Sequence, residues 1–357
     1  MKSYPVILIT GGAGFVGSSL AMLFKRDFPE CRIISFDNLR RRGSELTIHR
    51  LVTAGIEFFH GDIRSADDLA AVGPFDLLLD CSAEPSVHAG YNESPMYVIQ
   101  TNLLGTVHCL EAARRHQADI VFLSSSRVYS IPALRDLPLQ QQQDRLVIPE
   151  SCSGPGWSSM GLTRQFPCTG YRSMYGATKL SSEMLIEEYG AMYGLRAIIN
   201  RCGVLTGPWQ MGKVDQGFVV LWLARHFYGG SLAYMGFGGQ GHQVRDILHV
   251  SDLYRLLTLQ LMTIDQIHGV TYNVGGGPGG SVSLCELTRI CQKITGNTIE
   301  IQQKPVTTPA DIPYYVTDNT HITLETGWKP EYTTERILEE IFVWLTEHKT
   351  QLKPILS

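Results

Sequence analysis

The chain has 357 residues, of which 44% are hydrophobic and 18% charged, and its formal net charge at pH 7 is -4. This composition is typical of a globular enzyme with one large core, and it lacks the basic excess of proteins that bind nucleic acid. No apolar run approaches the roughly 18 residues that a membrane span needs, and the start of the chain does not resemble a secretion signal, so we expect a soluble cytoplasmic protein.

The eight cysteines are scattered along the chain, without a CxxC pair or the spacing of metal ligands. We therefore expect reduced thiols in a reducing compartment and no metal site. Cys152 and Cys168 share one irregular segment and are the pair that could form a disulfide or hold a metal, but no His or Cys companions complete such a site.

The first elements form a βαβ unit. Residues 5–10 are a short apolar strand that ends in glycines, and residues 15–28 have the three- and four-residue apolar spacing of a helix. Residues 32–36 form a second strand, which ends at Asp37. A strand, a tight turn, a helix and a second strand predict parallel pairing of the two strands.

The alternation of strand and helix continues and predicts an α/β fold, a Rossmann-type doubly wound parallel sheet followed by a smaller C-terminal lobe. Residues 130–172, rich in proline, glycine and serine, interrupt the pattern and are predicted to be a long ordered or semi-ordered loop, of a length that is often functional. Further strands are predicted at residues 56–60, 75–80, 120–124 and 196–200 and around Leu248, and helices at residues 98–116, 175–193, 216–228, 283–295 and 333–348.

The predicted division of the chain follows this change of pattern near Arg201, after which glycine and aromatic residues become frequent. The lobe is expected to bind the substrate at the carboxyl edge of the sheet, where open α/β sheets bind their ligands. We predict an NAD-binding Rossmann domain of residues 1–200 plus roughly 243–272, and a substrate-binding lobe of residues 201–242 plus 273–357.

Residues 10–17 read TGGAGFVG, a TGxxGxxG pattern between a predicted strand and a predicted helix. Glycine permits a tight turn and a close approach of the backbone to a pyrophosphate, and the helix N-terminus offers free N–H groups and a positive dipole end. In this context the pattern predicts a dinucleotide site rather than a glycine turn without a ligand.

Asp37 ends the second strand, where a carboxylate can bind the adenosine ribose hydroxyls and repel a 2′-phosphate. NAD is therefore favoured as the cofactor. Arg40, Arg41 and Arg42 follow closely and keep NADP open as the alternative, because a guanidinium could reach that phosphate. Asp62 lies in a GDI motif after the third strand and either contacts the adenine edge or closes a simple turn.

Tyr175 and Lys179 project from one face of one predicted helix. A tyrosine can take a proton from a hydroxyl near neutral pH only if its pKa falls from about 10, and a neighbouring ammonium favours the phenolate. Ser124, Ser125 and Ser126 end the strand at residues 120–124, where a hydroxyl could orient the substrate oxygen. Capping of backbone groups is the simpler role for Ser124 and Ser126.

These motifs together resemble the extended short-chain dehydrogenase/reductases that act on nucleotide-linked sugars. The resemblance rests on TGGAGFVG, FDN, GDIR, the NLLGT segment at Asn102, SSSRVY and YGATK, in that order, and it covers nearly the whole chain. Within the family, VDQGFVV at residues 214–220, QVRDILHVSD at residues 243–252 and GWKP at residues 327–330 are most similar to CDP-paratose 2-epimerases (CDP-tyvelose epimerases).

The resemblance implies that Ser125 is the catalytic hydroxyl, Tyr175 the base and Lys179 the ammonium that tunes this base. The implied cofactor contacts are Gly11, Gly14, Phe15, Val16, Gly17, Asp37, Asn38, Asp62, Ile63, Ser82, Ala83, Asn102 near the nicotinamide ribose, Ser124, Tyr175, Lys179 and Arg201. The implied substrate contacts are Glu84, Ser125, Ser126, Gln216 and Arg245.

Arg245 is the implied contact for the substrate diphosphate, because a guanidinium can bind phosphate oxygens through two hydrogen bonds. From the sequence alone, Arg245 could instead pair with Asp246 or Asp252. Pro313 stands where many relatives have a second phosphate-binding arginine, which leaves the diphosphate contacts open.

Two further departures from the family bear on the reaction. Ser126 and Arg127 stand where the 4,6-dehydratases carry Asp-Glu, which argues against dehydration. Glu84 replaces a small or amide residue and, with the long loop at residues 130–172, leaves the sugar open.

We expect an NAD-dependent epimerase of a CDP- or UDP-linked sugar, with C2 as the favoured carbon. The alternatives are a UDP-sugar 4-epimerase, a nucleotide-sugar dehydrogenase or reductase, and a non-enzymatic NAD-sensing protein. The helices that begin near Met96 and Tyr175 carry apolar residues beyond those needed to face the sheet, so we expect a homodimer or higher homo-oligomer through a four-helix contact.

Overall fold

The computed structural model describes residues 4–213 and 216–357, so Val214 and Asp215 of the VDQGFVV motif lie outside the described residues. Contacts divide the chain into two compact units. Unit 1 consists of Met1–Val128, Ser173–Arg201 and Leu253–Tyr272, and unit 2 of Tyr129–Arg172, Cys202–Asp252 and Asn273–Ser357.

The two units differ from the predicted division in two places. Residues 130–172 and roughly 243–252, which the sequence placed with the nucleotide-binding domain, group with unit 2. The binding role of each part stays a prediction.

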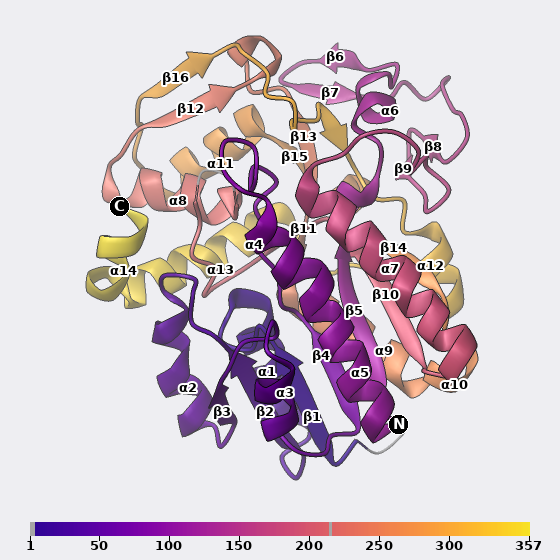
Figure 1. Cartoon of the computed structure of the whole chain (residues 1–357). Coiled ribbons are helices and arrows are strands. Elements are labelled where there is room, and N and C mark those ends of the chain that lie inside the picture. The colour runs from indigo at the N-terminus through magenta and orange to yellow at the C-terminus, as the bar shows by residue number, and fades with distance from the viewer. Residues whose placement is uncertain (1–3, 214–215) are drawn as a thin grey trace. The chain divides into compact units, whose positions relative to one another are not determined.

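A seven-stranded sheet is the centre of unit 1, and Figure 1 shows helices on both of its faces. The strands from β5 to β3 pair in parallel, as the βαβ pattern predicted. Both β4 and β5 are buried along their whole length, which is typical of a sheet covered on both faces. In order across the sheet, the strands are β14 (Thr271–Val274), β10 (Ala197–Cys202), β5 (Asp119–Ser125), β4 (Leu77–Asp80), β1 (Val6–Thr10), β2 (Arg32–Asp37) and β3 (Glu57–His60).

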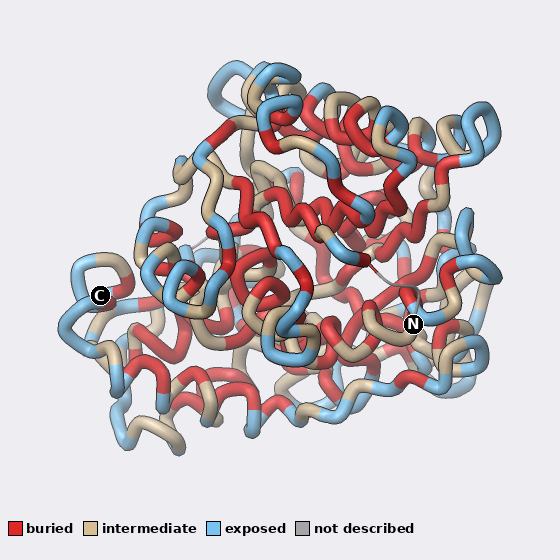
Figure 2. The backbone as a smooth tube through the Cα atoms, turned by 90° about the horizontal axis from the view of Figure 1, so that it is seen from below, coloured by how far each residue is buried: buried red, intermediate tan, exposed pale blue. Residues whose placement is uncertain are grey.

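The helices of unit 1 bury apolar side chains against this sheet. Cys109, Leu110 and Ile186 of two adjacent helices join one core with strand residues such as Leu8 and Phe122. In Figure 2 the buried segments, red, lie mostly in the interior, and the exposed segments, pale blue, lie mostly at the outside. The helices are α1 (Phe15–Asp27), α2 (Ile48–Thr53), α3 (Ala66–Ala71), α4 (Met96–Ile99), α5 (Gly105–His116), α7 (Met174–Tyr193), α9 (Val250–Met262) and α10 (Ile264–Ile267), with short helical turns η1 (Ser44–Thr47), η2 (Gln100–Leu104) and η3 (Ser126–Val128).

Unit 2 consists of small sheets and helices. β13 lies between β11 and β15 and also pairs with β17, while α8, α11 and α13 pack on one another. Its strands are β6 (Gln140–Gln142), β7 (Arg145–Val147), β8 (Trp157–Ser158), β9 (Gly161–Leu162), β11 (Val204–Thr206), β12 (Leu232–Met235), β13 (Val244–His249), β15 (Ser281–Ser283), β16 (Ile301–Lys304) and β17 (Tyr314–Tyr315). Its helices are α6 (Ile131–Arg135), α8 (Phe218–Tyr228), α11 (Leu284–Thr295), α12 (Thr320–Thr326), α13 (Thr334–Glu347) and α14 (Lys349–Leu356), with turns η4 (Phe237–Gly239) and η5 (Pro278–Gly280).

The segment at residues 130–172 is more regular than the predicted loop. It contains α6 and two short hairpins, β6–β7 and β8–β9, and the glutamine run forms β6. Arg135 connects this segment to the rest of unit 2, because it donates hydrogen bonds to the carbonyl oxygens of Thr308 and Asp311. These contacts are between residues far apart in the sequence, so no local pattern could have predicted them.

Candidate active site

The glycine-rich turn connects β1 to α1 and is tightly packed. A Cβ atom on Gly17 would lie 2.3 Å from the carbonyl oxygen of Gly11, and one on Gly11 would lie 2.8 Å from that of Cys81. Gly11 has a φ of +63°, which side chains disfavour. Gly14 caps α1 and Phe15 and Val16 begin it, so their N–H groups lie at the positive end of the helix dipole. The turn therefore fits a pyrophosphate.

Asp37 lies beside this turn and contacts its backbone. Its carboxylate accepts hydrogen bonds from the backbone N–H groups of Ala13, at 3.1 Å, and Leu39, at 2.8 Å. Burial raises the pKa of Asp37, although these hydrogen bonds and the nearby His60 oppose the shift. The structure thus places Asp37 against the glycine turn, where the sequence predicted the ribose contact.

The GDI motif lies beside Asp37. Asn38 donates a hydrogen bond of 2.9 Å to Asp62, and Arg64 forms an ion pair of 2.6 Å with it. Burial raises the pKa of Asp62, but the hydrogen bonds from Arg64 and Asn38 outweigh it and lower the pKa to about 2. Asp62 is therefore ionised at neutral pH. The Ile63 side chain packs closely against α5, where a Cβ on Gly105 would lie 2.5 Å from it.

The arginines that kept NADP open follow Asp37. The guanidinium of Arg40 lies 3.8 Å from the centre of the Tyr97 ring, a cation–π contact. Arg64 approaches the same ring at 4.9 Å. Tyr97 therefore holds Arg40 in this structure.

The loop after β4 contains the next predicted cofactor contacts, Ser82 and Ala83. Ser82 donates through its hydroxyl to the carboxylate of Asp80, at 2.6 Å, and the hydroxyl of Thr10 donates to the same oxygen, at 2.8 Å. Asp80 thus joins the loop to the start of the glycine turn. The sequence did not single out Asp80, because its partner Thr10 comes from another strand.

Asn102 connects the same loop to the helix that carries the predicted base. Its amide accepts from the N–H of Glu84 at 2.7 Å and donates to the carbonyl oxygen of Glu84 at 3.0 Å. It also donates to the hydroxyl of Thr178, at 3.3 Å. Asn102 lies in η2, a π-helical turn, and such turns are frequent at functional sites. Asn102, a predicted cofactor residue, therefore contacts α7 at Thr178, one helical turn after Tyr175.

The three predicted catalytic residues lie at one end of β5 and α7. Ser125 is the last residue of β5, and its hydroxyl accepts from the N–H of Arg127 at 3.2 Å. Ser173 caps α7 and accepts from the N–H of Gly176 at 3.2 Å, so Tyr175 lies in the first turn of the helix. Tyr175 is half-buried.

Lys179 lies one turn further along α7 and is only 2% exposed. Its ammonium donates to the carbonyl oxygen of Leu123, at 2.9 Å, and lies 4.4 Å from the centre of the Phe122 ring. These contacts fix the ammonium at the carboxyl end of β5. The helix spacing predicted from the sequence brings it to the same face of α7 as Tyr175.

Ser124 and Arg201, both predicted cofactor contacts, share a partner that the sequence did not predict. Arg201 forms a two-pronged ion pair with Glu183, with distances of 2.7 and 3.0 Å, and Ser124 donates a short hydrogen bond to the same carboxylate. Glu183 follows Lys179 by one further turn of α7, and this spacing was the signal that could have identified it.

The predicted substrate contacts are divided between the units. Ser126, at the start of η3, and Glu84 belong to unit 1, whereas Gln216 and Arg245 belong to unit 2. In unit 2, the guanidinium of Arg245 donates to the carbonyl oxygens of Val244, at 2.7 Å, and Ile312, at 2.6 Å. Gln216 pairs with Lys213 through backbone hydrogen bonds.

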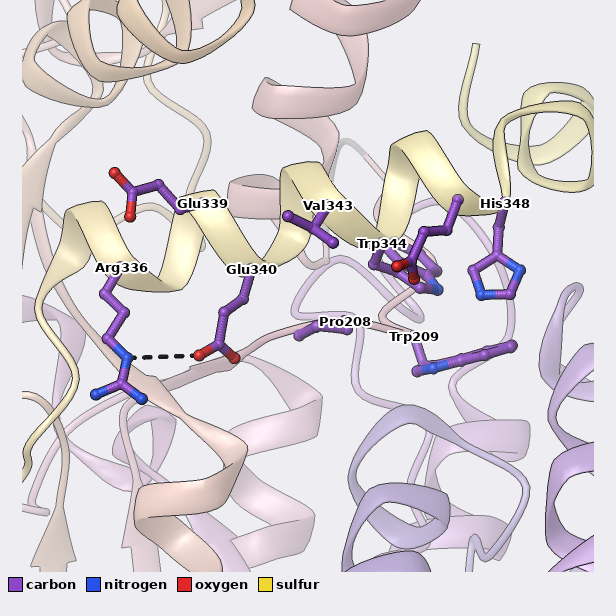
Figure 3. Close-up of a pocket in the computed structure, with 9 residues that line it drawn as sticks. Pro208, Trp209, Arg336, Glu339, Glu340, Val343, Trp344 and His348 are labelled. Carbon is purple, nitrogen blue, oxygen red and sulfur yellow. Dashed lines mark ion pairs between the residues drawn. The ribbon is translucent and has the colours of Figure 1, made fainter.

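Unit 2 also has a hollow of about 530 Å³ between α13 and the loop after β11. Figure 3 shows the ring of Trp209 facing Trp344 and His348, with ring centres 6.0 and 4.9 Å away. Arg336 and Glu340 line its other end. None of the predicted site residues lines this hollow.

Other structural observations bear on the predicted partners. No helix in the described ranges has the length and apolar content of a transmembrane span. Within residues 4–213 and 216–357, no group of three or more His, Cys, Asp or Glu residues is placed to hold a metal ion. The eight cysteines, all of which lie in the described ranges, form no disulfide there, and this includes Cys152 and Cys168.

Comparison with known proteins gives a consistent result. Residues 7–275 match the model of the NAD dependent epimerase/dehydratase family. The chain is 27% identical to CDP-paratose 2-epimerase of Salmonella typhi, over 95% of this chain and 98% of the relative. It is 26% identical to UDP-glucose 4-epimerase of Halalkalibacterium halodurans, over 96% of each chain.

Solved structures show the same similarity. The structure of dTDP-glucose 4,6-dehydratase from Bacillus anthracis in complex with NAD aligns with a TM-score of 0.76 and 25% identity, over 98% of this chain and 99% of that one. The predicted Rossmann-type α/β fold is therefore confirmed, and so is NAD as the cofactor.

Proposed function

The chain belongs to the NAD-dependent epimerase/dehydratase family, and we propose that it epimerises a nucleotide-linked sugar through a transient keto sugar. The observation that carries this proposal is the placement of Ser125, Tyr175 and the buried ammonium of Lys179 at the carboxyl edge of the sheet that carries the glycine-rich turn. This edge is where open α/β sheets bind their ligands.

The residues of unit 1 fit NAD. A Cβ would clash at Gly11 and Gly17, and at Gly14 it would lie 3.1 Å from the carbonyl oxygen of Gly11. Because the turn carries no side chains at these positions, its backbone can approach a pyrophosphate, and Asp37 lies beside it for the adenosine ribose. Ser82, Ala83 and Asn102 lie on the loop and helix towards Tyr175 and are proposed to contact the nicotinamide half. When bound, NAD accepts a hydride from a sugar carbon and returns it.

The chain's own side chains would move the proton. The nearby ammonium of Lys179 favours the phenolate form of Tyr175. This phenolate takes the proton of a sugar hydroxyl and later returns it. The hydroxyl of Ser125 holds the same sugar oxygen. Since the planar keto sugar can receive hydride on either face, rotation of the sugar inverts the carbon.

The favoured substrate is a CDP-linked sugar inverted at C2, because one of the most similar relatives is a CDP-paratose 2-epimerase. Ser126 and Arg127, in place of an acidic pair, disfavour the elimination of water. Inversion at C4 of a UDP-linked sugar is the second candidate, since the chain is also 26% identical to a UDP-glucose 4-epimerase over 96% of its length. Arg245 and Gln216 are proposed to contact the nucleotide diphosphate and Glu84 the sugar.

The test uses the purified protein with two labelled substrates. CDP-paratose deuterated at C2 should give its C2 epimer with the deuterium kept at C2, whereas UDP-glucose deuterated at C4 should be unchanged. Inversion of UDP-glucose alone would favour the second candidate, and net reduction of NAD in proportion to the sugar would indicate a dehydrogenase.

Matched tyrosine variants test the base. Tyr175→Phe should lower turnover by about 10²–10⁴-fold while it keeps NAD bound, because this is the contribution of general base catalysis by a positioned group. Tyr189→Phe, on the same helix but hydrogen-bonded to Glu111 at 2.8 Å, should remain active. A fully active Tyr175→Phe protein would exclude this mechanism and revive the NAD-sensing alternative.

We also propose a homodimer through two helical segments, the continuous α4–η2–α5 and α7. Met96, Leu104, Met184, Met192 and Tyr193 on these segments are exposed. Grouped apolar side chains of this kind mark protein interfaces, and two copies of the helix pair would form a four-helix contact.

A further inference from the structure

Asp80 is a buried carboxylate at the end of β4, only 1% exposed. One of its oxygens accepts the hydrogen bonds from Thr10 and Ser82. The other, Oδ2, is also buried and has no hydrogen-bond partner among the described residues. A buried charge is costly unless it is compensated by hydrogen bonds or by an opposite charge. The contacts of Oδ1 alone therefore do not account for this carboxylate.

The register of the sheet shows which residues lie beside Asp80. Thr10 of β1 and Phe122 of β5 are its direct neighbours on the two adjacent strands. Aligned residues of parallel strands point to the same face of a sheet. The side chains of Thr10, Asp80 and Phe122 thus form a row across one face.

Lys179 lies over this row. Its ammonium is 4.4 Å from the centre of the Phe122 ring, next to Asp80 in the row, and is itself buried. Cys109 of α5 lies in the field of both groups: burial raises the pKa of its thiol, Asp80 raises it further, and Lys179 lowers it. The carboxylate and the ammonium therefore share one buried region, with opposite charges.

We propose that Asp80 is the buried counter-charge of the Lys179 ammonium and that it sets the pH range in which Tyr175 and Lys179 work together. Asp80 is a positioning residue, because it acts through Lys179 and does not contact the reacting atoms. This inference rests on the proposed function, since it takes Tyr175 as the base.

Other charged groups on elements that pack against α7 have different partners. His108 bonds to the carbonyl oxygen of Ile63, and Glu111 bonds to Arg114 and Tyr189. Asp119 lies at the opposite end of β5. The substitution of Asp80 leaves the remaining groups near α7 in place. These are Arg127 on η3, Cys109 on α5, and Glu183 with its partner Arg201.

The sign of the effect follows from electrostatics. A nearby negative charge disfavours the loss of a proton from both the phenol and the ammonium. Asp80→Asn removes that charge and keeps the shape of the side chain. We expect the first deprotonation of the Tyr175–Lys179 pair to move to lower pH by about one unit, and the pH profile of turnover to move with it.

The experiment measures tyrosinate absorbance near 295 nm against pH in the NAD-bound protein. The contribution of Tyr175 is the difference between a protein and the same protein with Tyr175→Phe. This difference curve should shift to lower pH in Asp80→Asn and also in Asp80→Ser, a second variant without the charge. An unchanged curve, or one at higher pH, would overturn the inference.

Asp119→Asn is the matched control. Asp119 is equally buried and accepts from Tyr4, at 2.7 Å, so its replacement should lower stability without moving the titration of Tyr175. The absorbance readout does not need turnover. If Tyr175→Phe abolishes epimerisation and the curve of Asp80→Asn is unmoved, only this inference fails; if Tyr175→Phe is active, the proposed function fails.

Discussion

The guanidinium of Arg201 forms a two-pronged ion pair with the carboxylate of Glu183, at 2.7 and 3.0 Å, and Glu183 is only 2% exposed. This pair links the end of β10 to the middle of α7. Through the hydroxyl of Ser124 it also reaches the end of β5. These contacts connect α7, the helix of the proposed base, to the strands β10 and β5.

Breaking this pair should destabilise the protein strongly. Arg201→Ala leaves the carboxylate of Glu183 buried without its cation, and a loss of this kind costs about 3–5 kcal/mol. Urea unfolding should show this decrease. Arg32→Ala is the control, because the pair of Arg32 with Glu57 is exposed and should contribute no more than about 1 kcal/mol. Equal losses in both variants would contradict the structural role of the buried pair.

Gly17→Ala should weaken NAD binding. Its Cβ would lie 2.3 Å from the carbonyl oxygen of Gly11, so the glycine turn must move away from the position that fits a pyrophosphate. We expect at least a tenfold loss of affinity, about 1.4 kcal/mol, in calorimetric titration with NAD. Gly279→Ala, where no atom lies within 4 Å of the added Cβ, is the matched control and should bind NAD normally. Unchanged binding by Gly17→Ala would place the pyrophosphate elsewhere.

His249 should make stability depend on pH. Burial lowers its pKa to about 4, with Asp252 opposing the shift and Arg336 adding to it. The neutral ring, stacked on Tyr332 at 4.2 Å, thus contributes stability above the unfolded pKa of about 6.5. This contribution is lost as the pH falls from about 6.5 towards 4, by about 2 kcal/mol at pH 5.

Unfolding measured between pH 8 and pH 5 checks this expectation. His249→Phe should be less sensitive to acid by that amount, because a phenyl ring cannot bind a proton. His321→Gln, which changes an exposed histidine of α12, should behave like the unmodified protein. If all three proteins lose the same free energy, His249 is not responsible.

Charged side chains on the proposed dimer face should separate the subunits. Leu104→Glu combined with Met184→Glu introduces two charges into the four-helix contact, where burial without a partner is costly. Sedimentation velocity at micromolar concentration should then show a monomer. Leu324→Glu, on the exposed surface of α12, should leave the dimer intact. A monomer before any substitution would remove the proposal.

Much of unit 1 could be predicted from the sequence because its signals are local. The strand, glycine turn and helix at residues 5–28 follow one another without interruption, and the predicted limits of α1 and β1 agree with the structure within about one residue. Tyr175 and Lys179 were placed on one helix by their spacing alone. In each case the residues that act together are close neighbours along the chain.

The contacts that surround these residues could not be predicted in the same way. Asp80 meets Thr10 and Phe122 only because β4 lies between β1 and β5, and the sequence does not state the order of strands. The small strands at residues 140–162 are also stabilised from a distance, by residues after 272 such as Val316, whose carbonyl oxygen accepts from the N–H of Leu162. Local chemistry therefore determined which residues this protein offers for a dinucleotide and a proton. The tertiary structure alone decided which buried charges surround them, because strand order brings together groups that are far apart along the chain.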